Sequence, residues 1–501
     1  MSRADGKRWQ RTSPLAAIFY IGRIVQALAK NAAQSLVPLA VVIFSLEGNL
    51  FMRIILAVAF LAAVIVTGSI LQYLFFRYRI TDQSILIREG VLKKKQLDIK
   101  FDRIQAINTQ QNILFRYFGL VTVTFDTAGS SKQEGNLPAV KMALADSLKT
   151  RIRRERRIPA SDENDNEVDE QQPLLSLDKK DMIRIGLSSN RALIFLVLLG
   201  PILENIDDRI ESLIDRGVLD FITNGDDISI TLGATLIALA SIAFLLFLTL
   251  ASILGAFLRY HRFTLIQDED TLRSTGGLLT RHEHSINFAK VQSLEARQNL
   301  MLRWFGRFRV RAKQTSSRGE ERGKHFIVPL CQPDELPRLA ESVFSNEFPE
   351  ADLQPESSAF QPISIRYFRS RLLIFGVYPA LVVGAGLLPF IGVYVLLVLL
   401  WILVVAACAW VVYRKRGYFV GASGVLLRRG FVGYRTNAFL HRKVQRISVT
   451  QTPSQQRKGL ATVRFFLASG TLKLPYVDHA MAKQLRDYVL YRVESSRLAW
   501  H

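Results

Sequence analysis

Cysteine is scarce in this sequence, and the motifs that usually carry catalysis are missing. Only two cysteines occur in 501 residues, Cys331 and Cys408, and Cys408 lies inside an apolar run. This placement excludes a disulfide framework and a cysteine-based zinc site. The chain has no GxxxxGK(S/T), nucleophile elbow, HExxH or CxxC, and its carboxylates gather in stretches where no fixed geometry would pair them. We therefore expect neither an enzyme nor a cofactor site.

Histidine is also sparse, and most of the histidines lie in one segment, which makes this segment a candidate metal site. Four of the seven histidines, His261, His282, His284 and His325, lie in one segment. Two imidazoles at His282 and His284 would share one strand face, as a metal pair would. No Asp, Glu or Cys set with ligand spacing completes the pair, so we expect exposed strand histidines and no metal.

Acidic residues are too few to balance the basic ones, since 43 Asp and Glu face 65 Lys and Arg, for a net charge of +22. Such charge suits a nucleic-acid binder or a protein at an anionic membrane. The distribution of the apolar residues favours a membrane protein, because they form runs whose lengths are close to the ~20 residues that span a bilayer. The secure runs are 54–76, 228–257 and 372–412, the last folding at 388–392; the weaker ones are 31–46 and a run around 192–203. We predict six helices in three hairpins; alternatively the two weaker ones are buried or interfacial.

One sequence pattern occurs three times in the chain. When the copies are aligned on Gln105, Gln292 and Gln445, glycines fall at fixed distances before and after the glutamine. The preceding glycines are Gly90, Gly277 and Gly430, and the following ones are Gly119, Gly306 and Gly459. Each copy follows an apolar block, which predicts a repeated unit of two membrane helices and one water-facing module.

Inside each copy, apolar and polar residues alternate between turn signals, which predicts antiparallel hairpins. A helical pattern closes each copy, at 139–153, 334–344 and 477–493. The stretch 161–173 is acidic and lacks apolar periodicity, so it is expected to be a disordered linker, and 348–362 is expected to play the same role. The predicted domains are an N-terminal hairpin (1–76), module 1 (77–157), a linker (158–180), hairpin 2 (181–257), module 2 (258–346), a linker (347–369), hairpin 3 (370–412) and module 3 (413–501).

Charges beside the hairpins predict the orientation. The connector inside the second hairpin carries eight acidic residues against Arg209 and Arg216, whereas the N-terminus and the segment 151–157 are basic. By the positive-inside rule, all three modules and both termini should face the cytoplasm.

The stretch 93–130 resembles the membrane-flanked bacterial PH-like domain family, of the YdbS/YdbT type. The matching residues in the first copy are Arg103, Ile104, Gln105, Gln111, Arg116, Phe118, Gly119 and Leu120. The second copy keeps most of this pattern, whereas 453–458 replaces the apolar turn in the third. The resemblance implies a multi-pass protein of the bacterial inner membrane. Each module would be a bent seven-stranded sheet capped by a helix, with no assigned reaction and an association with resistance to membrane-active peptides.

Basic and aromatic residues near the repeated turn are candidates for binding membrane lipids or a partner. They are Arg116 and Tyr117 in the first copy, and Arg303, Trp304 and Arg307 in the second; Lys93, Lys94 and Lys95 are further candidates. Aromatic rings favour the interface, and each nearby cation gains ~1 kcal/mol from an anionic leaflet. The alternative, which we favour for the aromatics, makes Phe118, Trp304 and Phe305 core anchors. The three lysines could equally guard an edge strand.

Gly376, Ala380 and Gly384 have small-xxx-small spacing, which favours close helix packing. Taken together, the sequence predicts a non-enzymatic scaffold that binds anionic lipids or a protein partner. That partner would be a smaller single-module relative or another copy, in a homo- or hetero-oligomer, with no role for nucleic acid. The alternative is a subunit of a transporter or exporter of peptide or lipid.

Overall fold

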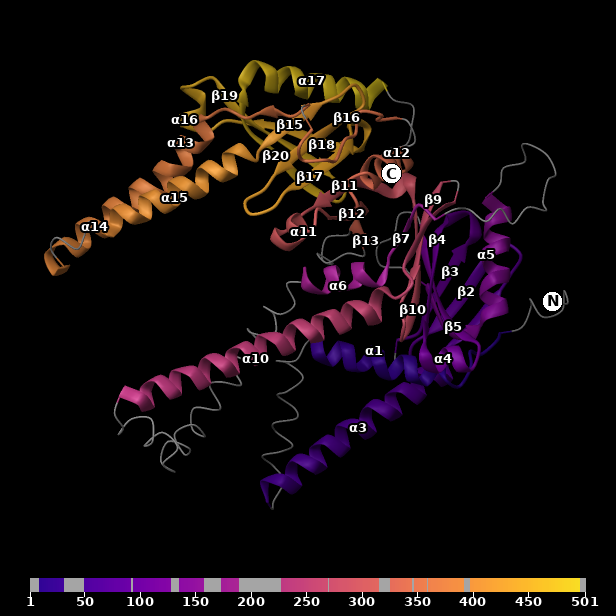
Figure 1. The fold of residues 1–501 in the computed structure, drawn as a ribbon. Coiled ribbons are helices and arrows are strands. Elements are labelled where there is room, and N and C mark those ends of the chain that lie inside the picture. The colour runs from indigo at the N-terminus through magenta and orange to yellow at the C-terminus, as the bar shows by residue number, and fades with distance from the viewer. Residues whose placement is uncertain are drawn as a thin grey trace. The chain divides into compact units, whose positions relative to one another are not determined.

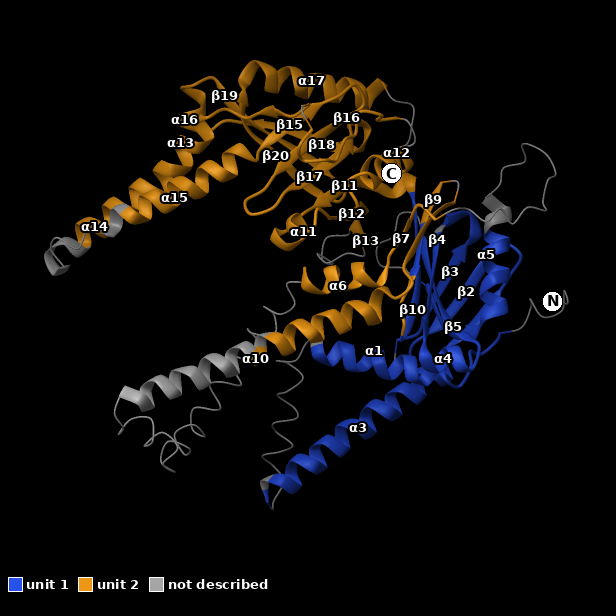
Figure 2. Cartoon of the chain, in the orientation of Figure 1, with its two compact units in different colours: residues 1–171, 273–275, 279–287 blue, residues 172–272, 276–278, 288–501 orange. Residues whose placement is uncertain are grey.

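The computed structural model describes residues 9–30, 49–91, 93–127, 135–156, 173–188, 227–268, 270–314, 325–344, 347–357, 359–391 and 397–495 (Figure 1). The weaker predicted spans, 31–46 and 192–203, lie outside the described residues, as does the acidic connector of the second hairpin. The chain divides into two compact units (Figure 2). Unit 1 holds residues 1–171, 273–275 and 279–287, and unit 2 holds 172–272, 276–278 and 288–501.

Unit 1 is built on the first repeat. Its elements are α1 (Ala16–Lys30), α3 (Leu50–Phe75), β1 (Arg77–Ile80), β2 (Ser84–Glu89), β3 (Lys95–Lys100), η2 (Phe101–Arg103), β4 (Ile104–Asn112), α4 (Ile113–Tyr117), β5 (Leu120–Thr127), β6 (Gly135–Lys141) and α5 (Met142–Arg156). Strands β1-β2-β3 form one sheet, and β4, β5 and β6 are neighbours in another. Ile85, Ile99, Val123, Phe125 and Leu148 from both sheets and α5 meet in one apolar core.

One strand of the second repeat belongs to unit 1. Strand β10 (Thr280–Asn287) pairs antiparallel with β4, placing Glu283 opposite Thr109. The central residues of β9 (Thr271–Gly276) also belong to this unit. The resemblance implied that each module keeps its own seven-stranded sheet. The antiparallel sheets of the prediction are present, but a single seven-stranded sheet within each module is not, because the outer edge of β4 is filled by the next repeat.

Unit 2 holds the rest of the second repeat and the whole third repeat. The second repeat supplies β7 (Leu175–Ser176), α6 (Lys179–Leu187), α10 (Asp227–Tyr260), β8 (Thr264–Asp268), η3 (Phe288–Lys290), β11 (Val291–Arg297), α11 (Leu300–Trp304), β12 (Phe308–Gln314), β13 (Phe326–Cys331) and α12 (Glu335–Phe344). The third supplies β14 (Gln361–Pro362), α13 (Arg366–Leu372), the π-helix η4 (Leu373–Val377), α14 (Tyr378–Ile391), α15 (Leu397–Arg414), β15 (Gly417–Val420), β16 (Gly424–Arg429), β17 (Arg435–Leu440), η6 (His441–Lys443), β18 (Val444–Thr450), α16 (Pro453–Gln456), β19 (Leu460–Leu467), β20 (Gly470–Asp478) and α17 (His479–Ser495).

Sheet sharing recurs in unit 2. One sheet has the order β13-β12-β11-β17-β16-β15-β14, so β11 of the second repeat pairs with β17 of the third. The remaining strands of the third repeat form the sheet β18-β19-β20. We call the β4–β10 pairing seam 1 and the β11–β17 pairing seam 2. Aligned on the shared Gln and Gly residues, both seams have the same register, because Thr109 opposite Glu283 corresponds to Ala296 opposite Thr436.

A short segment before each hairpin pairs with the first strand of its module. Gln10 bridges to Tyr78, β7 pairs with β8, and β14 pairs with β15. The segment 347–369, predicted as a disordered linker, is therefore packed, and Phe348 within it is buried in contact range of the backbone at Gly424. The linker predicted at 158–180 is described from residue 173, and there it holds β7 and the start of α6. Both expectations were wrong in these parts, because short apolar anchors inside a polar stretch escape a composition rule.

A second glutamine of each copy, six residues after the one used for the alignment, forms the same turn in all three copies together with the following glycine. The side chains of Gln111, Gln298 and Gln451 each donate to a backbone carbonyl across the turn, to Leu120, Arg307 and Leu460 respectively. The next residue caps a short helix, since Asn112, Asn299 and Thr452 accept from backbone amides. Gly119, Gly306 and Gly459 then adopt φ of +62°, +60° and +63°. This left-handed conformation explains why glycine follows each copy at a fixed distance.

Replacing Gly306 with alanine is expected to destabilise unit 2 by about 1 kcal/mol, because a Cβ disfavours the left-handed conformation. The space around Gly306 is open, so strain alone would act. Equilibrium denaturation of the full chain in detergent measures the loss. Gly22→Ala is the matched control, because Gly22 lies in α1 with open space around it and should gain helix propensity. Equal effects of both substitutions would contradict this account of the turn.

Two helices of the described chain are long and apolar enough to cross a membrane, 51–75 and 366–386. Shorter apolar helices occur at 16–29, 246–260 and 400–414. The prediction of three spanning hairpins is thus supported only in part. Helix α1 was not predicted; its buried Ala16 and Tyr20 pack into the core of the first module.

Candidate phosphate-binding site

The short helices α4 and α11 present aromatic side chains to the surroundings. Tyr117 is 86% exposed and Trp304 is 80% exposed, at the same position of the two repeats, and Phe118 is also exposed. Phe115 and Leu302 are instead the buried anchors of these helices. The expectation that Trp304 and Phe118 anchor the core was wrong, because a five-residue helix turns just one side chain inward. Phe305 is half-buried.

The third repeat lacks this apolar surface. Gln455 of α16 takes the buried anchor position and donates to Thr462 Oγ1 at 2.9 Å. The neighbouring Arg457 and Lys458 are exposed. An aromatic face at the repeated turn is thus a property of the first two copies.

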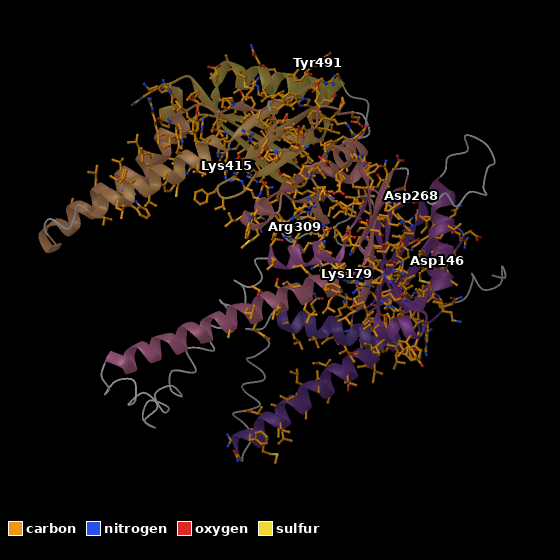
Figure 3. The ribbon with its side chains drawn as sticks, viewed as in Figure 1. Asp146, Lys179, Asp268, Arg309, Lys415 and Tyr491 are labelled. Carbon is orange, nitrogen blue, oxygen red and sulfur yellow. The ribbon has the colours of Figure 1, made fainter. Side chains whose placement is uncertain are left out.

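Seam 2 carries a row of four arginines on adjacent strands. Arg297 lies opposite Arg309 on one side and opposite Arg435 on the other, and Arg435 lies opposite Arg429. Side chains that face each other across strands share one face of the sheet, with Cβ atoms about 4.5–5.5 Å apart. Like charges placed so are destabilising. We call these residues the arginine row; Figure 3 labels Arg309 at its β12 end.

A buried carboxylate stabilises one arginine of the row and a neighbouring lysine. Glu295, whose side chain is 3% exposed, forms ion pairs with Lys313 at 2.5 Å and Arg435 at 3.4 Å. Burial alone would raise the pKa of the Glu295 carboxyl, but Lys313, Arg435 and Arg311 outweigh it and hold that pKa below its ordinary value. Glu295 is therefore ionised at neutral pH.

Burial and neighbouring positive charges lower the pKa values of two arginines of the row. Burial, followed by the charges of Arg435 and Arg311, lowers the pKa of Arg297. Burial and Arg435 likewise lower the pKa of Arg429. Guanidinium groups crowded on one face bind phosphate well, because their paired N–H donors match its oxygens. The arrangement is suited to a phosphate-bearing anion.

The row ends beside a cluster of basic and aromatic side chains. Tyr434 pairs with Gln298 through both backbone groups, and its ring lies 5.6 Å from Arg303 Cζ and 4.9 Å from Lys415 Nζ. Lys415, labelled in Figure 3, follows α15 directly and donates to the carbonyl of Val432 at 2.8 Å. Phe431 and Val432 at this hairpin tip are exposed. The cluster therefore lies where an apolar helix enters its module.

The other predicted site residues lie elsewhere. Lys93, Lys94 and Lys95 are exposed on β3 and the turn before it, in unit 1, and Arg116 is exposed on α4. Arg307 is half-buried after α11. The structure thus brings Arg303 to the Tyr434 ring, and Trp304 stacks on Phe305 next to it in the chain. Arg116, Tyr117 and the lysines belong to unit 1.

Gly376, Ala380 and Gly384 are all buried on η4 and α14. A Cβ at Gly376 would meet Val405 Cγ1 of α15 at 3.3 Å. Helices of the third hairpin therefore approach closely at this small residue.

The rings of His282 and His284 stack with centroids 5.7 Å apart. Between them, Glu283 turns to the other face of seam 1, where it pairs with Lys149 at 2.8 Å. Burial would raise the pKa of Glu283, but Lys149, Thr109 and Arg273 hold it below its ordinary value. Over the described part of the chain, no group of three or more His, Cys, Asp or Glu is arranged to hold a metal.

The arginine row was missed by reasoning from sequence. Its signal is visible, because Arg309, Arg311 and Lys313 alternate along β12. Alternation places these cations on one face, but it does not say which strand will lie alongside.

Comparisons with known proteins agree with the repeated fold. The family model described as bacterial PH domain matches residues 32–156, 227–346 and 374–493. A relative from Bacillus subtilis (strain 168), the UPF0699 transmembrane protein YdbT, is 23% identical over 418 residues, covering 80% of this chain and 81% of the relative. No solved structure matches.

Proposed function

Since this chain belongs to the bacterial PH domain family, we propose that it is a non-catalytic membrane protein whose modules form a platform binding anionic phosphate headgroups. The arginine row carries this proposal. Arginines placed opposite one another on adjacent strands repel each other and cost stability, and such costs are characteristic of binding sites. The relative from Bacillus subtilis is a transmembrane protein. A membrane location of this chain would place its modules beside lipid headgroups.

The surroundings of the row fit a leaflet. Exposed apolar side chains lie near the row in the chain. Phe431 and Val432 occupy the hairpin before Tyr434. Trp304 follows Arg303, whose guanidinium lies over the Tyr434 ring. Aromatic rings prefer the membrane interface, and arginine reaches the phosphates beside them. Trp304 would enter the interface while the arginines contact the headgroups. The basic segments next to the hairpins support a cytoplasmic position for the modules.

Trp304→Ser is expected to weaken docking of module 2 onto an anionic leaflet about tenfold, because ~1.4 kcal/mol of interfacial burial is lost. The full chain is reconstituted in nanodiscs of phosphatidylcholine with or without phosphatidylglycerol. Hydrogen exchange of the α11 amides reports docking, and slower exchange is expected only with phosphatidylglycerol.

Arg457→Ser is the matched control, since it changes the corresponding position of the third repeat, where the aromatic is absent. It should leave exchange in α11 unchanged. Identical α11 exchange in neutral and anionic nanodiscs would refute the leaflet contact.

A further inference from the structure

Neighbouring repeats are joined at two places by the same kind of strand pairing. Each pairing brings together two complementary sheet edges. A β4-type strand, β4 or β11, offers its outer edge, and the next repeat fills it with a β3-type strand, β10 or β17. Two strands of these same kinds stand at sheet ends. Strand β3 ends the sheet β1-β2-β3, and β18 ends the sheet β18-β19-β20. Among the described strands, none pairs with either outer edge.

The lysines on β3 do not exclude pairing. Lysine on an edge strand often prevents sheets from joining. However, the position of Lys94 is taken by Arg281 in β10, and Arg281 pairs opposite Gln111 in seam 1. The position of Lys95 is taken by Arg435, which pairs opposite Arg297 in seam 2. Cations are thus tolerated at this end of a seam.

We propose that β18 of one copy pairs antiparallel with β3 of a second copy, in the register of the two seams. In this register Val449 would lie opposite Gln96 and Thr450 opposite Lys95, because these positions correspond to Ala296 opposite Thr436 and Arg297 opposite Arg435. A second copy is the occupant that the fold favours, because every copy carries both edges and the chain already joins them twice. Such a head-to-tail contact uses one edge of each copy and leaves the other edge free for the next copy. It therefore builds an open chain or a closed ring of copies.

The register gives a sharp test. Gln298 and Tyr434 exchange both backbone hydrogen bonds, so the next pair, Arg297 and Arg435, is of the non-hydrogen-bonded kind with closely spaced Cα atoms. Thr450 and Lys95 would form the corresponding pair between copies. Cysteines placed there are close enough for a disulfide.

The experiment uses the full chain in native membranes, in a Cys408→Ala background; Cys331 is buried and its pKa is raised by burial. Lys95→Cys chains with one tag are co-expressed with Thr450→Cys chains with another, and mild oxidation should give a covalent dimer carrying both tags. Lys95→Cys with Gln445→Cys is the control, because Gln445 lies five residues away, about 17 Å along the strand. The control pair should give at most about a tenth of the dimer.

A proline at Asp98 tests the strand pairing itself. By the same alternation the amide of Asp98 points away from β2, and its side chain is exposed. Asp98→Pro removes that donor and should lower the mixed dimer about tenfold or more, whereas Asp98→Ala keeps the donor and should not. Equal dimer from both variants would overturn the proposal, and so would equal yields from the test and control cysteine pairs. A disulfide from Thr450→Cys to a different protein would also overturn it.

Discussion

Replacing Glu295 with glutamine is expected to destabilise unit 2 by about 3 kcal/mol, because it leaves partly buried cations without their buried carboxylate. Glutamine keeps the volume of the side chain but removes its charge. Lys313 and Arg435, now paired with Glu295, would repel each other and the other arginines of the row. Urea denaturation of the full chain in detergent, with hydrogen exchange of β11 and β17 as a local readout, measures this loss.

Glu283→Gln in seam 1 is the matched control. Its side chain is 17% exposed and pairs with Lys149 and Arg273, outside a row of opposed arginines, so we expect a loss nearer 1 kcal/mol. If the two substitutions cost the same, the special role of Glu295 in neutralising seam 2 is wrong.

The pH dependence of seam 2 follows from the same carboxylate. Its pKa is lowered in the folded chain from the ordinary value of 4.5, so the unfolded chain binds the proton first as pH falls. The contribution of Glu295 is therefore complete above pH ~4.5 and is lost as pH falls through the folded pKa. Hydrogen exchange across β11 and β17 should accelerate in this acidic range, and Glu295→Gln should remove that part of the acceleration.

Local patterns in the sequence predicted the repeated unit but not how the repeats join. The fixed distances from Gln105 to Gly90 and Gly119 reflect a capped helix and a left-handed turn, which depend on nearby residues alone. Strand alternation tells which side chains share a face, yet it does not identify the neighbouring strand. The sharing of sheets between repeats, and with it the arginine row, could not be derived from alternation.

The exposed aromatics show a second limit. Phe115 and Tyr117 are both apolar and close in sequence, but the helix buries the first and exposes the second. A short helix gives too little periodicity to decide which residue faces inward. Trp304 was therefore assigned to the core, although the structure exposes it.

Removing two arginines of the row should nearly abolish its binding of phosphate headgroups. In Arg297→Gln/Arg429→Gln, each lost guanidinium costs about 1.5–3 kcal/mol of charge-assisted hydrogen bonding, so we expect affinity to fall about 100-fold or more. Both positions avoid Lys313 and Arg435, the ion-pair partners of Glu295, and so leave that carboxylate neutralised. Thermal unfolding of the full chain in neutral detergent, titrated with phosphatidylglycerol or with inorganic phosphate, measures binding as stabilisation.

The sign of the effect without ligand distinguishes a binding site from a structural cluster. Removing opposed like charges relieves repulsion, so the variant should unfold at a higher temperature than the wild type when no anion is added. Lys473→Gln/Lys483→Gln removes two exposed cations elsewhere in unit 2 and should change neither baseline nor titration. Stabilisation by phosphatidylglycerol but not by inorganic phosphate would assign the site to the lipid, and the reverse would assign it to a soluble anion. A variant less stable than the wild type without anions, and equally stabilised by them, would mean that the arginine row serves the fold alone.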